Sequence, residues 1–193
     1  MNKKMLRQLE QGRRTTLLGR LYLTATQRKT LLKWTMYSLF YLLLQVLQDV
    51  VFCRIRVLGA PPDVVPGCLL LICLLEQPAS GGVFVLCASL FRCLTGVDLG
   101  AFTLAFLVFG GVVLSAFRRT YLVRRYSTTI MTCWFGLAAH QMGLFLLGQF
   151  LGRTTFSRLP ALLGGLALAC LGLMALYFPL NAISKIGGNP WSE

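Results

Sequence analysis

Apolar residues fall into long runs along this chain, and short polar or basic stretches separate the runs. The first run extends from Trp34 to Phe52, and comparable runs cover residues 99–117, 127–151 and 159–180. Each is long enough to cross the hydrocarbon core of a bilayer as a helix. The pattern therefore predicts four clear membrane-spanning helices.

The segment from Val64 to Gly96 contains two short apolar runs, "VVPGCLLLICLLEQ" and "VFVLCASLFRCLTG", with "PASGG" between them. Hydropathy alone allows two short spans, a re-entrant hairpin or one irregular span. Basic residues beside apolar spans favour the cytoplasmic side, and the two strongest basic clusters are the first 33 residues and "RRTYLVRR" at 118–125. An even number of crossings must separate these clusters, so we expect two spans here, at 63–77 and 80–96.

These spans predict an all-α integral membrane protein, a compact bundle of six transmembrane helices with cytoplasmic N- and C-termini. Residues 1–33 form a basic cytoplasmic tail, residues 34–182 the membrane domain, and residues 183–193 a cytoplasmic C-terminal tail. Apolar residues are interleaved with basic residues at roughly helical spacing in the first tail, which allows either an interfacial helix on anionic lipid or a solvated segment. The expected location is a membrane, with the basic segments on its cytoplasmic side.

Composition agrees with this class, because 56% of the 193 residues are hydrophobic and only 13% are charged. The net charge of +13 lies mostly in predicted cytoplasmic stretches, which favours anionic lipid and argues against nucleic acid. The seven cysteines include no CxxC pair, so neither a disulfide framework nor a metal site is predicted. The chain has no GxSxG, HExxH or Walker motif, so we expect no catalytic residues, no cofactor and no enzyme activity.

Ionisable residues inside apolar spans are costly, which makes them candidates for function. The predicted topology brings four of them towards the outer face, as a polar cluster or a partner contact: Asp49, Asp63, Arg92 and Asp98. Gln45, Gln48 and Asp49 share one helical face, which favours Asp49 as the partner of Arg92. Alternatively, Arg92 reaches the outer headgroups and each aspartate completes a helix end.

Asp63 belongs to the proline-rich stretch "LGAPPDVVPG" at 58–67. We interpret this stretch as a helix start, with Asp63 near the positive end of the helix dipole and Pro66 in the first turn. The single histidine, His140, lies midway along its span with no carboxylate on spans five or six. We expect a neutral histidine that is hydrogen-bonded to a neighbouring helix, rather than part of a proton relay.

Small residues recur along one face of the last span, and we interpret them as a candidate helix-packing face: Ala161, Gly165, Ala169 and Gly172. Small side chains let helices approach closely inside a bilayer. This face would pack within the bundle or receive a partner helix, and we favour the first.

Over residues 34–185 the chain resembles the MreD family of bacterial rod shape-determining membrane proteins. The similarity follows "LLLQVLQDVVFCRIRVLG" at the end of the first span, "APPDVV" at the start of the second, and "EQPASGGVFVLCASLFRCLTGVDLGAFTLAF" through the third and fourth. Two features differ: Arg92 stands where the family often has an acid, and the basic tail is longer.

The resemblance implies a non-catalytic component of the cell-elongation machinery that directs peptidoglycan synthesis. It implies as partners the bitopic protein MreC, together with MreB, RodZ, and RodA with its transpeptidase. The family's fold is similar to the substrate-binding subunits of energy-coupling-factor importers. A vitamin- or metal-importer subunit is therefore the alternative, and a lipid-flipping or proton-coupled carrier is a third reading.

Overall fold

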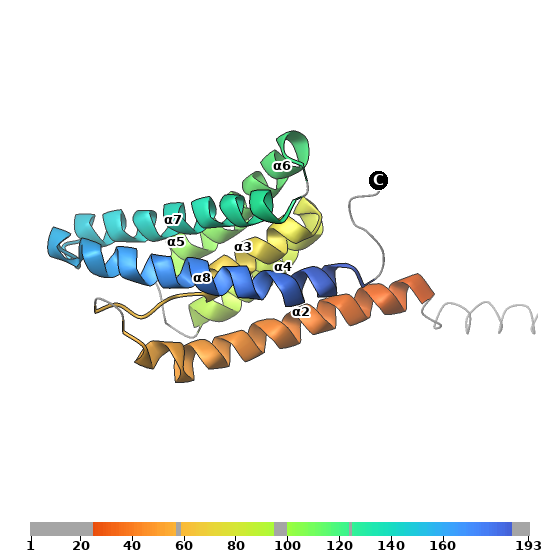
Figure 1. Cartoon of the computed structure of the whole chain (residues 1–193), viewed down its shortest axis with the longest axis horizontal. Helices are drawn as coiled ribbons and strands as arrows, with labels where there is room; N and C mark the ends of the chain where they lie inside the picture. Colours follow the sequence, from red (N-terminus) through yellow and green to blue (C-terminus); the bar gives the residue numbers. More distant parts are fainter. Residues whose placement is uncertain (1–24, 57–58, 95–99, 124, 187–193) are drawn as a thin grey trace, which may run out of the picture.

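The computed structural model describes residues 25–56, 59–94, 100–123 and 125–186, and within these ranges the chain is helical with no β-strand. Figure 1 shows a bundle in which the beginning of α2 and the end of α8 lie at the same end. We call this the inner end and the opposite one the outer end, after the predicted orientation. The helices are α2 (Ala25–Val50), α3 (Val65–Leu75), α4 (Pro78–Leu94), α5 (Gly100–Ala105), α6 (Gly111–Tyr121), α7 (Tyr126–Phe150) and α8 (Leu159–Ser184).

Four helices are long and apolar enough to cross a membrane: Thr26–Arg54, Gly100–Tyr121, Tyr126–Phe150 and Phe156–Ser184. The second joins α5 and α6 through a π-helical turn at Phe106–Gly110, and short 3-10 turns at Phe52–Arg54 and Phe156–Arg158 belong to the first and last. The all-helical class is therefore confirmed for the described residues. Crossing by all six predicted spans stays a prediction.

The helix boundaries differ from the predicted spans mainly at the start of the bundle. Helix α2 already includes residues 25–33, which the sequence assigned to the basic tail, and it continues without interruption past Trp34. The other differences are small, such as the extension of α6 to Tyr121 and of α8 to Ser184. Residues 1–24, where an interfacial helix was considered, lie outside the described residues.

Helix α3 forms the centre of the bundle, and all eleven of its residues are buried. It packs against α2, α4, α6, α7 and α8, which surround it in Figure 1. A helix that is apolar on every side is expected where neighbours cover it completely. Its eleven residues span only about 16 Å, roughly half of the ~30 Å hydrocarbon thickness.

Residues 60–64 precede α3 in a non-helical path that runs along α8. A Cβ atom added to Gly165 would lie 3.4 Å from the carbonyl oxygen of Pro61, and one added to Gly172 would lie 3.4 Å from Val64 Cγ1. Gly172 is near the middle of α8, so α3 begins at about half the height of the bundle. Span two is therefore a half-helix on the inner side, and a proline-containing segment covers the outer half.

The small-residue face of α8 packs within the bundle, but against this segment rather than against another helix. Gly165 and Gly172 adjoin residues 60–64, and Ala169 between them is buried. Ala161, nearer the outer end, borders a cavity. Bulky side chains on this face would displace the segment, which explains why small residues recur there.

Candidate functional site

Arg92 and Asp63 form an ion pair on the outer side of α3. The Arg92 Nη2 atom donates to Asp63 Oδ2 at 2.6 Å, from the last turn of α4 to the residue just before the N-cap of α3. Arg92 is only 1% exposed, so it does not extend into the outer headgroups as the alternative interpretation required. A buried cation needs a compensating carboxylate, and Asp63 supplies one.

This pairing corrects one prediction. The sequence favoured Asp49 as the partner of Arg92, but the Asp49 carboxylate is exposed and accepts from Gln45 Nε2 at 3.3 Å. Asp63 lies at the start of α3 as predicted, one residue before the N-cap Val64, and no side-chain capping bond forms there. The fourth candidate, Asp98, lies outside the described residues.

Gln48 on α2 stabilises the non-helical segment before α3. Its Nε2 atom donates to the Pro62 carbonyl at 2.7 Å, and its Oε1 atom accepts from the Val64 N–H at 3.3 Å. Irregular backbone inside a membrane protein requires such internal partners, because lipid offers none. Pro61 and Pro62 have no N–H group, so they reduce the number of donors in this segment that need an acceptor.

These residues border a cavity of about 870 Å³ at the outer end, which we call the outer cavity. Its walls come from the end of α2, residues 59–63, Arg92, α7, the turn at 154–158 and the first turns of α8. Its polar lining includes two carboxylates, two guanidinium groups and two amides: Asp49, Asp63, Arg92, Arg158, Gln48 and Gln141. A site with both charges and apolar walls suits a peptide segment or a small zwitterionic molecule.

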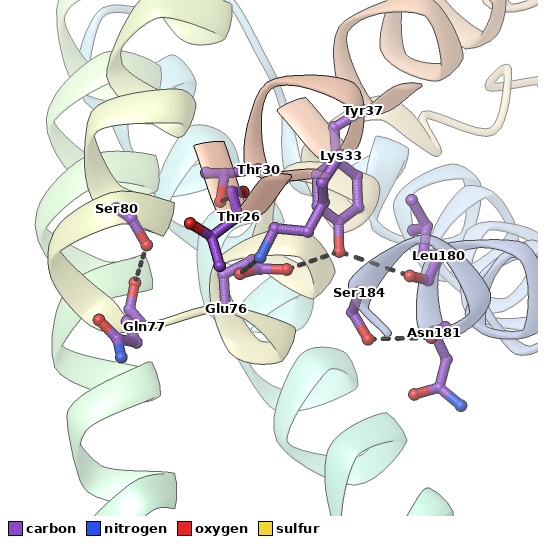
Figure 2. Close-up of polar contacts among 10 residues, drawn as sticks. All are labelled: Thr26, Thr30, Lys33, Tyr37, Glu76, Gln77, Ser80, Leu180, Asn181 and Ser184. Carbon is purple, nitrogen blue, oxygen red and sulfur yellow. Dashed lines mark hydrogen bonds and ion pairs between the residues drawn. The ribbon is translucent and has the colours of Figure 1, made fainter. Parts of the chain in front are cut away.

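A second polar cluster, which the sequence did not predict, lies at the inner end of α3. Lys33 Nζ contacts Glu76 Oε2 at 2.7 Å, and the Tyr37 hydroxyl donates to Glu76 Oε1 at 3.0 Å (Figure 2). The same hydroxyl lies 3.4 Å from the carbonyl oxygen of Leu180 on α8. Glu76 is 2% exposed, so its carboxylate is buried between α2 and the end of α3.

Arg118 completes the inner end. Its side chain is fully buried, and Nη1 donates to the Leu74 carbonyl at 2.7 Å. Carbonyls in the last turn of a helix lack an intrahelical donor and carry the negative end of the dipole, so a cation is favourable there. The sequence assigned Arg118 to the basic cytoplasmic loop at 118–125, but α6 continues through it to Tyr121. For the cluster around Glu76, two features of the sequence could have indicated the contact: Lys33 and Tyr37 share a helical face, and Glu76 ends an apolar run.

His140 is fully buried against aromatic rings of α5 and the π turn. Its ring centroid lies 6.2 Å from that of Phe102, in a stacked arrangement, and 5.4 Å from that of Phe106. The expected hydrogen bond to a neighbouring helix stays a prediction. Among the described residues, no three His, Cys, Asp or Glu side chains are grouped so as to hold a metal ion.

Over the described residues, the fold and the site together define a class: an all-helical protein in which helices long and apolar enough to span a membrane surround a buried half-helix that polar groups hold at both ends. Comparison of the chain with protein-family models, with curated proteins and with solved structures finds no match.

Proposed function

We propose that the protein is a non-catalytic, six-pass component of the bacterial cell-elongation machinery, with both termini in the cytoplasm. It would bind a bitopic partner similar to MreC and support directed peptidoglycan synthesis together with MreB, RodZ, and RodA with its transpeptidase. The resemblance to the MreD family over residues 34–185 supplies the identity of these partners.

The outer cavity is the observation that carries the binding role. It lies beside the extended segment 59–63, where the half-helix leaves backbone and polar side chains facing a volume of about 870 Å³. A bitopic partner would reach this volume with the residues that follow its transmembrane helix just outside the bilayer. Charged groups of both signs in the lining would then select the sequence and register of that segment.

The test is purification of the tagged, full-length protein from its native membranes, followed by mass spectrometry. Recovery of the MreC-like protein and of RodA supports the proposal. Recovery of energy-coupling ATPase subunits without elongation proteins contradicts it. A strain that carries the same tag on an unrelated multi-pass protein controls for nonspecific recovery.

Arg92 allows a sharper test in a shape-complementation assay. We expect Arg92→Ala to lose rod shape, because the Arg92–Asp63 ion pair holds the cavity-lining segment beside α3. Arg92→Lys should retain part of the function. Arg153→Ala is the matched control, since Arg153 is exposed near the outer cavity but does not line it. Wild-type shape with Arg92→Ala would refute a role for this pair.

A substrate-binding subunit of a vitamin or metal importer is the second candidate. The size of the outer cavity favours it, because ligand sites for small molecules commonly enclose about 300–1,000 Å³. In this case a vitamin at low concentration would raise the unfolding temperature of the purified protein. The elongation role predicts no such shift with vitamins, but a shift with a peptide from the outer juxtamembrane segment of the partner.

A further inference from the structure

A groove between α2 and α4 lies outside the polar clusters described above. It encloses about 650 Å³ and is lined by Trp34, Ser38 and Tyr41 of α2 and by Val83, Phe84 and Cys87 of α4, among others. Its floor is well defined: the Trp34 and Phe84 ring centroids lie 5.6 Å apart, and the Tyr41 hydroxyl donates to the Ala88 carbonyl at 2.8 Å.

A furrow on α2 continues this groove towards the inner end. It is lined by Thr26, Gln27, Thr30, Leu31 and Thr35, and it shares Trp34 and Ser38 with the groove. Figure 2 shows Thr26 and Thr30 close to Lys33. The combined surface therefore changes along its length, from threonine and glutamine side chains at the inner end to aromatic rings towards the bilayer interior.

One exposed basic side chain flanks the furrow. Arg28, Leu31 and Thr35 fall at i, i+3 and i+7, so exposed Arg28 shares a helical face with two residues of the furrow. Lys33 adds no uncompensated charge, because its Nζ atom contacts Glu76 Oε2 at 2.7 Å. The inner end of the surface therefore carries one basic side chain beside the threonines of the furrow.

We propose that this surface, the α2–α4 groove with its furrow, binds an anionic phospholipid of the inner leaflet. The phosphate headgroup would lie in the furrow beside Arg28, and an acyl chain would lie between Trp34, Phe84 and Phe91. The Arg28 guanidinium at the inner end matches an anionic headgroup, and the aromatic part of the groove extends towards the bilayer interior as an acyl chain does.

A transmembrane helix fits this groove less well. Close packing between helices in a bilayer is favoured by small residues along one continuous face. Here the small residues Ser38, Ser80, Cys87 and Ala88 are interspersed with Trp34, Phe84 and Phe91, and a flexible acyl chain can follow such an uneven lining. The same argument applies to a second copy of this protein. The inference depends on the membrane orientation proposed above, but not on the elongation partners.

Trp34 reports directly on this groove. The full-length protein with Trp134→Phe and Trp191→Phe would retain Trp34 alone and be reconstituted into symmetric phosphatidylcholine bilayers. Phosphatidylglycerol or phosphatidylcholine with brominated acyl chains is then added at equal mole fraction, and quenching of Trp34 fluorescence is measured. From the quenching of Trp34, we expect an apparent affinity for phosphatidylglycerol about fivefold higher than that for phosphatidylcholine. This is the preference expected for one basic residue near anionic lipid.

Two further variants separate a site from ordinary lipid contact. Arg28→Gln should abolish the preference for phosphatidylglycerol, whereas Arg153→Gln at the outer end should leave it unchanged. Ser38→Phe, or Cys87→Phe on the opposite wall, should fill the groove and reduce quenching by both lipids. Leu39→Phe, which places the same ring on an exposed face of α2 that does not line the groove, is the matched control.

Three results would overturn the proposal. The first is equal quenching by both lipids in the parent protein, which indicates nonspecific surrounding lipid. The second is a preference for phosphatidylglycerol that survives Arg28→Gln and both groove-filling substitutions. The third is little quenching by either lipid, which indicates that a second copy or another helix covers Trp34. Because these bilayers contain no other protein, none of the results depends on the elongation role.

Discussion

The cluster formed by Lys33, Tyr37 and Glu76 predicts an unequal response to substitution of its members. Lys33→Met keeps the length and apolar stem of the side chain but removes the charge that compensates a 2% exposed carboxylate. Removal of one partner from a buried pair typically destabilises by about 3–5 kcal/mol. We expect about 3 kcal/mol here, because the Tyr37 hydroxyl still donates to Glu76.

Glu76→Gln should destabilise less, by about 1–2 kcal/mol. The amide oxygen still accepts from Tyr37, and Lys33, whose side chain is 12% exposed at the inner end, can turn towards water. The double variant should then lose less stability than the sum of the two single variants, with a coupling of about 1–3 kcal/mol. Thr30→Met, on an exposed residue of the same helix, is the matched control and should have little effect.

The assay is reversible unfolding of the protein in mixed micelles with increasing denaturing detergent, followed by tryptophan fluorescence. Free energies of unfolding from the four-member cycle give the coupling directly. Additive effects of Lys33→Met and Glu76→Gln would refute the conclusion that these groups interact in the folded protein. A larger loss for Glu76→Gln than for Lys33→Met would contradict the role assigned to burial.

Three further predictions use the same unfolding assay. Gln48→Leu should destabilise by about 1–3 kcal/mol, because it removes the hydrogen-bond partner of the Pro62 carbonyl and the Val64 N–H. No change in stability would mean that water forms hydrogen bonds with these groups equally well. Arg118→Met should lose about 1.5–3 kcal/mol with the bond to the Leu74 carbonyl, and retained stability would contradict a capping role. Gly165→Leu should destabilise more than the same substitution at Gly152, where no atom lies within 4 Å of an added Cβ, although the positive φ there adds some strain.

The long helices were predictable because hydropathy and length depend only on local sequence. Helices α7 and α8, for example, begin within one residue of the positions expected from the sequence. The half-helix was not predictable in this way. An apolar run that starts after Pro62 has the same composition whether its first residues are helical or extended, and only packing against Gly165 and Gly172 distinguishes the two.

The site was predictable only in part, for a similar reason. Charged residues inside apolar runs identified Arg92 and Asp63, which the structure brings together. The choice among three aspartates needed the path of residues 60–64, which sequence periodicity does not report. Glu76 and Arg118 were missed because they stand at the ends of apolar runs, where charged side chains are usually solvated, whereas here neighbouring helices cover them.

The central claim is that α3 spans only the inner half of the bundle while residues 60–64 cover the outer half beside α8. Disulfide cross-linking in a cysteine-free background tests it most directly, because the bond forms only between closely spaced Cβ atoms. The account predicts rapid cross-linking of Val64→Cys with Gly172→Cys, near the middle of α8, and none with Ala161→Cys near its outer end. Cross-linking to Ala161→Cys instead would mean that span two is a full-length helix and would contradict the account.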